Sequence, residues 1–226
     1  MRMGLLIPAV NTVAEEEFHA GTPAEVSVHT ARMSVGGTSA EDVRRMVDES
    51  LPRAVSDIAA VRPDVVVLAC TAVGAVLGPD GEADLVARMS RELDVPVVSM
   101  NAAVAHALER ARARRVAVVT PYPEAVTEKV ADGLRATGLE VAVTGSMGFE
   151  DAFGIAAIPV EELVGFVART VEGHDFDTLF LSCGNLRMRE ARDALAERFG
   201  VPVVASNLAA LEDALEVLAG SGERVA

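Results

Sequence analysis

The sequence contains two cysteines, Cys70 and Cys183, and each ends an apolar run of the kind that forms a buried strand. Small or polar residues follow both thiols, namely Thr71, Ala72, Gly184 and Asn185. Backbone N–H groups at such a strand end lower the pKa of a thiol and offer hydrogen-bond donors to a carboxylate. We therefore expect Cys70 and Cys183 to form a catalytic pair.

Free cysteines are also common in protein cores, so either thiol alone would be read as a packing residue. An internal repeat changes that interpretation, because three segments of the first half recur in order in the second half. The matching segments are residues 4–8 and 116–121, 63–70 and 176–183, and 95–101 and 201–207. The first two pairs share an offset of 113 residues and the third has an offset of 106, which indicates a small deletion. Each copy of the repeated unit thus carries one cysteine at an equivalent position.

The elements that must position these cysteines are short apolar runs alternating with helix-period segments. This alternation predicts an α/β fold with parallel sheets flanked by helices. We predict two similar flavodoxin-like lobes related by pseudo-twofold symmetry, formed by residues 1–100 plus 207–226 and by residues 101–206. Because ligands bind beyond the carboxyl ends of parallel strands, two facing lobes would place the cysteines on opposite walls of one cleft.

Two other strand ends carry polar candidates. Asn11 and Thr12 follow the first strand, and Thr12 begins a Thr-x-x-Glu capping box, so we assign Thr12 to the helix cap and Asn11 to the ligand; a structural role for Asn11 in the turn is the alternative. Tyr122 lies at the matching place in the second half, where its phenol can bind a carboxylate or simply fill a loop. Asn101 and Asn207 are expected to cap helices.

Composition excludes several classes of function. The net charge of −14 argues against binding to nucleic acids or anionic membranes, which depends on basic patches. The single lysine, Lys129, leaves almost no candidate for Schiff-base chemistry, and the four histidines show no zinc-binding spacing. Phosphate-binding glycine motifs are missing from the sequence as well. We therefore expect no cofactor and no metal.

The apolar runs are far shorter than the roughly 20 residues of a membrane helix. The first residues lack the layout of a signal peptide, so we expect a cytoplasmic protein. A reducing compartment also disfavours a disulfide between the two cysteines.

Several short motifs together resemble the maleate cis–trans isomerases. They are Pro8-x-x-Asn11-Thr12, Ala69-Cys70-Thr71, Thr120-Pro121-Tyr122, Ser182-Cys183-x-Asn185-Leu186-Arg187 and Pro202-Val203-Val204-x-Ser206-Asn207. These isomerases share a two-lobed superfamily with arylmalonate decarboxylases and aspartate/glutamate racemases. The resemblance covers almost the whole chain, and the residues after the two cysteines fit the isomerase branch better than the racemases.

The resemblance implies a cofactor-free reaction on a small carboxylate. Cys70 would add as a thiolate to the double bond of maleate, and Cys183 would transfer a proton on the opposite face. The residues expected to hold the carboxylates are Asn11, Thr71, Ala72, Tyr122, Gly184 and Asn185. We also expect the chain to form a homo-oligomer, a dimer or a tetramer.

The chain departs from the isomerase pattern at positions where those enzymes commonly carry hydroxyl or amide groups. The positions are Ala9, Val10, Ala72, Gly184 and the segment 151–155. Fewer donors indicate a substrate with an apolar part or with one carboxylate. Racemisation of an amino acid by two cysteine bases, decarboxylation of a substituted malonate, and non-catalytic binding of a carboxylate stay open as alternatives.

Overall fold

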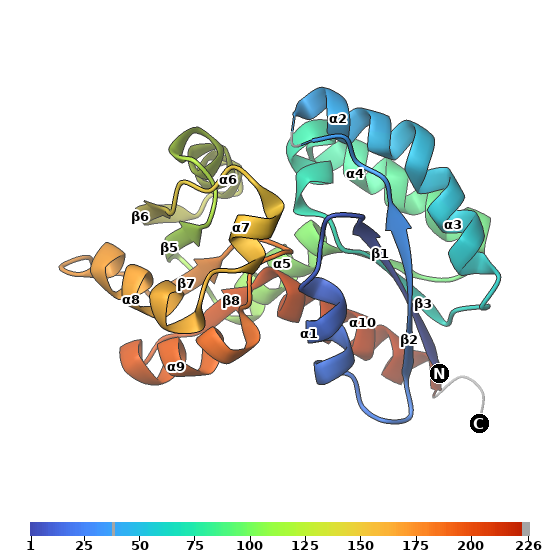
Figure 1. Cartoon of the computed structure of the whole chain (residues 1–226). Coiled ribbons are helices and arrows are strands. Elements are labelled where there is room, and N and C mark those ends of the chain that lie inside the picture. Colours follow the sequence, from blue (N-terminus) through green and yellow to red (C-terminus); the bar gives the residue numbers. More distant parts are fainter. Residues whose placement is uncertain (38, 223–226) are drawn as a thin grey trace.

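The computed structural model describes residues 1–37 and 39–222 of the chain. Within these residues, eight strands form two four-stranded parallel sheets, one from each half of the sequence (Figure 1). Their strand orders, β2-β1-β3-β4 and β6-β5-β7-β8, give both sheets the same topology. The predicted α/β fold with two similar lobes is therefore confirmed. The division of the chain between the lobes stays a prediction, and its last residues, 223–226, lie outside the described residues.

The register of the first and third strands of each sheet repeats, whereas a bulge at Val116 and Ala117 shifts the pairing of the first and second strands in the second sheet. They are β1 (Arg2–Pro8), β2 (Ser27–Met33), β3 (Val65–Leu68), β4 (Val97–Ser99), β5 (Arg115–Thr120), β6 (Glu140–Ser146), β7 (Thr178–Leu181) and β8 (Val203–Ala205). Met3 pairs with Val65 in the first sheet, and Val116 pairs with Thr178 in the second. In the second pair, each residue lies 113 positions after its counterpart in the first pair, which is the offset between the repeated segments. Cys70 and Cys183 therefore follow equivalent, fully buried strands.

Helices connect the strands and cover both faces of each sheet (Figure 1). They are α1 (Ala14–Gly21), α2 (Ala40–Arg45), the π-helical turn η1 (Met46–Ser50), α3 (Leu51–Ala59), α4 (Thr71–Leu93), α5 (Met100–Arg110), α6 (Glu124–Ala136), α7 (Ala152–Ala156), α8 (Val160–Val171), α9 (Arg189–Phe199) and α10 (Ser206–Gly222). The short helix α7 is absent from the sequence prediction, because five residues are too few to show a helical period.

The two lobes share a hydrophobic core. One buried cluster combines Leu5 of β1 and Phe180 of β7 with α5 and α10, which pack against each other. Helix α10 also contacts β3, β4 and β8, so the end of the described chain joins the two sheets. In the described part of the chain, no helix combines the length and the apolar character needed to cross a membrane.

The connection after β3 is longer than the connection after β7. Helix α4 begins directly after Cys70 and is broken at Gly78, whose φ of 71° and ψ of 170° are not helical. Pro79 follows, and its missing N–H fits the start of a new helical segment. The change in offset from 113 to 106 falls between Cys183 and β8, so the second lobe lacks seven residues of this connection.

Candidate active site

Cys70 and Cys183 lie at the carboxyl ends of β3 and β7. Cys70 is the N-cap residue of α4, and Cys183 begins the loop that leads to α9. Both are free thiols and both are buried, with exposed fractions of 6% and 3%. Both lie close to Tyr122, because each of them raises the pKa of its phenol, and Cys183 also raises the pKa of Cys70. The structure thus brings the predicted pair together.

Tyr122, which follows β5, connects the walls that carry the two cysteines. Its hydroxyl interacts with the sulfur of Cys183 and with the hydroxyl of Thr71. Burial, followed by the neighbouring Cys183, raises the pKa of Tyr122 well above its ordinary value. The phenol is therefore a neutral donor that faces both lobes.

Burial raises the pKa of both thiols to about 11. Backbone N–H groups at the start of α4 oppose this increase at Cys70. At Cys183 the Tyr122 hydroxyl and the N–H of Asn185 oppose it. Strand-end N–H groups do lower the thiol pKa as expected, but burial outweighs them, so the expected net decrease is not found. Both thiols are protonated at neutral pH in this closed arrangement.

Asn11 is buried at the boundary between the lobes. Its Nδ2 donates to the carbonyl oxygen of Gly184 at 2.8 Å. Its Oδ1 accepts from the N–H groups of Val13 and Ala14 at 3.0 and 2.9 Å, which satisfies the start of α1. Asn11 rather than Thr12 therefore closes this helix end, and the predicted Thr12 cap is wrong. The side chain of Thr12 is exposed.

Asn185 forms a second connection between the lobes. Its backbone N–H donates to the Cys183 sulfur at 3.2 Å, and its Oδ1 accepts from the N–H of Thr12 at 2.9 Å. Its Nδ2 donates to the carbonyl oxygen of Ala152 at 2.7 Å, which fixes the start of α7. Asp151 caps α7 through the N–H of Gly154 at 2.7 Å, so its carboxylate is used within the loop.

Ala72 and Gly184 offer backbone rather than side-chain groups. The N–H of Ala72 lowers the pKa of the neighbouring Cys70. Gly184 is packed closely, because a Cβ at this position would lie 3.3 Å from Nδ2 of Asn11. All of the predicted binding residues except Asn11 therefore border one of the two cysteines directly or through Tyr122, and Asn11 contacts the loop of Cys183.

Two buried glutamates near the cysteines were not predicted. Glu82 lies 6% exposed beneath the first turn of α4, and Glu17 lies 6% exposed between α1 and the loop before α9. Burial raises the pKa of both carboxyl groups. Glu17 stands in an acidic run that suggests a solvated face. Its helical phase with Val13, Ala14 and Phe18, which are all buried, is the signal that places it inside.

Asn101 and Asn207 bind these glutamates. The amide of Asn101 lies 3.1 Å from the Glu82 carboxylate oxygens. The amide of Asn207 lies 2.8 Å from a carboxylate oxygen of Glu17. The predicted capping role is wrong for Asn101, because Ser99 caps α5 through the N–H of Ala102. The described bonds of Asn207 likewise include no cap of α10, since its amide donates to Glu17 and to the Gly184 carbonyl.

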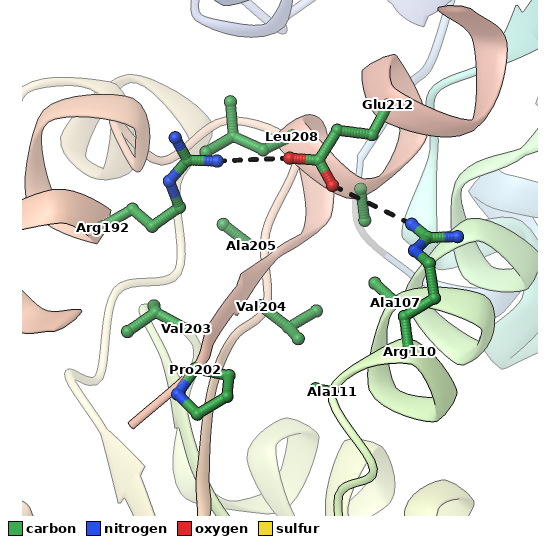
Figure 2. Close-up of a pocket in the computed structure, with 11 residues that line it drawn as sticks. Ala107, Arg110, Ala111, Arg192, Pro202, Val203, Val204, Ala205, Leu208 and Glu212 are labelled. Atoms are coloured by element: carbon green, nitrogen blue, oxygen red, sulfur yellow. Dashed lines mark hydrogen bonds and ion pairs between the residues drawn. The ribbon is translucent and has the colours of Figure 1, made fainter. Parts of the chain in front are cut away.

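A groove of about 270 Å³ lies apart from the cysteines, between α5, α10 and the edge strand β8 (Figure 2). Glu212 accepts a hydrogen bond from Arg192 at 3.2 Å and lies 3.8 Å from Arg110 (Figure 2). Glu212 thus pairs with both arginines, and the lining includes none of the predicted site residues. Within residues 1–37 and 39–222, no three His, Cys, Asp or Glu side chains form a group that could hold a metal ion.

Similarity to known proteins agrees with this geometry. The family model described as arylmalonate decarboxylase matches residues 3–225. A maleate isomerase of Nocardia farcinica is 30% identical over 217 residues, which cover 91% of this chain and 85% of that protein. An arylmalonate decarboxylase of Bordetella bronchiseptica is 33% identical over 161 residues, which cover 71% of this chain and 67% of that protein.

A solved structure adds a chemical observation about a relative. It is a serine-for-cysteine variant of the Nocardia farcinica maleate cis–trans isomerase with a covalently bound succinylcysteine intermediate. It matches with a TM-score of 0.87 and 27% identity, covering 96% of this chain and 92% of that chain. With the repeated sheets and the paired thiols, these matches show that the chain belongs to the family of maleate cis–trans isomerases and arylmalonate decarboxylases.

Proposed function

We propose that the chain is a cofactor-independent cis–trans isomerase of maleate or a related small unsaturated carboxylate. The observation that carries this proposal is the pair of buried thiols at equivalent strand ends, with the Tyr122 phenol between their walls. Two opposed thiols suit a reaction in which one attacks a carbon atom and the other moves a proton. The succinylcysteine intermediate of the Nocardia farcinica relative is the product that such an attack on maleate would give.

The reaction needs Cys70 as a thiolate and Cys183 as a thiol, so the pair loses one proton before it begins. The Cys70 sulfur adds to one carbon of the double bond, and Cys183 gives its proton to the other carbon. This step leaves a succinyl thioether on Cys70 and a thiolate on Cys183. After rotation about the new single bond, Cys183 takes a proton back while the carbon–sulfur bond breaks. Fumarate leaves, and the starting thiolate and thiol are restored.

Hydrogen-bond donors around the two thiols would hold the carboxylates and stabilise the charge that develops during addition. We assign this role to the hydroxyls of Thr71 and Tyr122 and to the N–H groups at Ala72 and Gly184. We assign the same role to the side-chain amides of Asn11 and Asn185, which would exchange their present hydrogen bonds between the lobes for bonds to the carboxylates. Because both thiols are buried, binding of a substrate requires the packing around them to change.

We also propose that the chain works in the cytoplasm as a homo-oligomer, a dimer or a tetramer, without nucleic-acid or membrane partners. The need for two reduced thiols supports a reducing compartment. The charge of −14 supports the absence of polyanionic partners. Size-exclusion chromatography with light scattering measures the oligomeric state directly.

Proton NMR of maleate incubated with the protein tests the isomerase proposal. Appearance of the fumarate signal, and its absence with both Cys70→Ser and Cys183→Ser, is the expected result. Full activity in both serine variants would refute the paired-thiol mechanism. Parallel samples with aspartate, glutamate and phenylmalonate detect the competing reactions. Exchange of the Cα proton in D2O would indicate racemisation, and loss of carbon dioxide would indicate decarboxylation.

Decarboxylation of a substituted malonate is the second candidate, because the matching family model and one relative carry that description. The apolar character of Ala72 and Gly184 also favours a substrate with an apolar group. That reaction needs one thiol to protonate an enediolate, so Cys183 alone would suffice. Turnover of phenylmalonate by Cys70→Ser would establish a decarboxylation that needs only Cys183.

A further inference from the structure

Each cysteine has a buried glutamate behind it, and an asparagine connects the two in both lobes. The asparagine comes from the segment after β4 or β8. Its amide nitrogen donates to the glutamate and to the carbonyl oxygen of the residue that follows the cysteine. We infer that Glu17 and Glu82 are positioning residues, each of which fixes the main chain beside one thiol through its asparagine. This inference rests on the proposed function, in which the thiols are the reacting groups.

In the first lobe, Glu82 is held entirely by neighbouring segments. Ser99 donates from Oγ to the carboxylate at 2.8 Å, and Asn101 donates from Nδ2 to both carboxylate oxygens at 3.1 Å. The same amide donates to the carbonyl oxygen of Thr71 at 3.2 Å. The kink at Gly78 brings this part of α4 back beneath the first turn. The packing is tight, since a Cβ at Gly74 would collide with both partners.

In the second lobe, Glu17 reaches across from α1. Its carboxylate accepts from the backbone N–H groups of Met188 and Arg189 at 2.7 and 2.8 Å, at the N-terminus of α9. Asn207 donates to it at 2.8 Å and to the carbonyl oxygen of Gly184 at 3.1 Å. Although the glutamate comes from the other lobe, the connection from carboxylate to cysteine loop is the same.

The hydrogen bonds fit ionised carboxylates, because every one of these partners donates to a glutamate oxygen. The negative charge then acts on the nearby thiol: Glu82 raises the pKa of Cys70, and Glu17 raises that of Cys183. Arg187 is the cation that acts on Glu17, and it also pairs with the exposed Glu16. Ser99 and Asn101 are the groups that act on Glu82. Each carboxylate therefore influences one cysteine.

Single-cysteine proteins test the inference without any substrate. Cys183→Ser leaves only Cys70, and Cys70→Ser leaves only Cys183. The rate of alkylation by iodoacetamide, followed by intact-protein mass spectrometry across pH, reports the titration of the remaining thiol. Glu82→Gln is expected to lower the midpoint for Cys70 by about one pH unit, because a neighbouring negative charge is lost. Glu17→Gln is expected to do the same for Cys183.

The controls remove an exposed charge from the same helix. Glu16→Gln is matched to Glu17→Gln, and Asp84→Asn is matched to Glu82→Gln; both residues are exposed. Neither control is expected to move the midpoint of either thiol. An unchanged midpoint in the Gln variants, or equal shifts at both cysteines from one substitution, would overturn the inference. An unchanged midpoint would show that the glutamate charge does not act on the thiol. Equal shifts at both cysteines would indicate that the substitution loosens the packing of the whole site.

Glu17→Asp and Glu82→Asp serve where a Gln variant does not fold. Each keeps the charge but withdraws the carboxylate by one methylene, which breaks its bond to the asparagine. We expect kcat for maleate to fall at least tenfold while the thiol midpoint moves by less than about half a pH unit. An unchanged kcat would overturn the positioning role. A protein that shows the alkylation shifts but does not turn over maleate would refute the proposed function alone.

Discussion

The surroundings of Cys70 and Cys183 differ, although their strands share one register. The polar groups behind Cys70 come from segments that follow strands of its own sheet, with Glu82 on α4 after β3 and Asn101 on α5 after β4. The groups behind Cys183 come in part from the opposite lobe, with Asn11 before α1 and Glu17 within it. The polar groups near Cys70 therefore follow strands of the sheet that carries it. The polar groups near Cys183 depend in part on how the two lobes pack against each other.

The seven-residue difference in the connections explains this asymmetry. In the first lobe the extra length allows α4 to bend at Gly78 and return Glu82 toward the strand end. The shorter connection after Cys183 lacks a corresponding segment, and Glu17 occupies the N-terminus of α9 instead. The repeated sheets thus place the two thiols at equivalent strand ends, and the connections of unequal length give the thiols different neighbours. Different roles in one reaction become possible for chemically identical groups.

Removing the thiols one at a time should have the largest effect and should separate their roles. Cys70→Ser and Cys183→Ser are each expected to lower turnover of maleate by about 10³-fold or more. Only Cys183→Ser keeps the attacking thiol, so only this variant should accumulate an adduct heavier by one maleic acid. Intact-protein mass spectrometry after incubation with maleate measures the adduct. An adduct that forms only in Cys70→Ser would exchange the two roles.

Tyr122→Phe should affect the two cysteines unequally. The phenol interacts with the sulfur of Cys183 and lowers its pKa, so its removal should move that pKa above about 11. Loss of one donor in the site is expected to lower kcat by about 10²-fold. Alkylation across pH in the single-cysteine backgrounds measures the shift, which should be larger at Cys183 than at Cys70. A larger shift at Cys70 would contradict the assignment of the phenol to Cys183.

The sequence predicts the two parallel sheets well, because their strands follow from hydrophobic periodicity and from the internal repeat. Apolar runs such as 65–69 and 178–182 identify the buried strands, and the constant offset of 113 residues predicts that their registers match. The first helical turn after Cys70 is harder to predict, since Gly74, Gly78 and Pro79 interrupt the helical pattern there.

The site is less predictable because its polar groups act across long sequence distances. Thr12 carries a valid capping motif, yet the neighbouring Asn11 satisfies the helix through contacts that depend on Gly184 of the other lobe. Glu17 is paired with residues more than 170 positions away. The net effect on the thiols depends on how completely the lobes bury them, which no local motif specifies. The residue types were therefore predictable, whereas their partners and pKa values were not.

Alanine at the two glycines near the cysteines compares the packing of the walls. A Cβ at Gly74 would overlap Glu82 and Asn101, so Gly74→Ala is expected to destabilise the protein by about 2 kcal/mol. At Gly184 the nearest atom, Nδ2 of Asn11, would lie 3.3 Å away, and the expected cost is below about 1 kcal/mol. Urea unfolding measures both values. Equal costs would show that the two walls are packed alike.

The smallest expected effect distinguishes the two residues that could cap α1. Asn11→Ala removes the acceptor of two backbone N–H groups and the bond to the Gly184 carbonyl, and should lower the free energy of unfolding by about 1.5 kcal/mol. Thr12→Ala changes an exposed side chain and should stay within about 0.5 kcal/mol of the unchanged protein. Because Gly184 keeps its bond to Asn207, the loss at Asn11 should stay below that of a fully unpaired carbonyl. If urea unfolding showed a larger loss of stability for Thr12→Ala than for Asn11→Ala, Thr12 would be the cap of α1. Asn11 would then not stabilise the contact with the Cys183 loop.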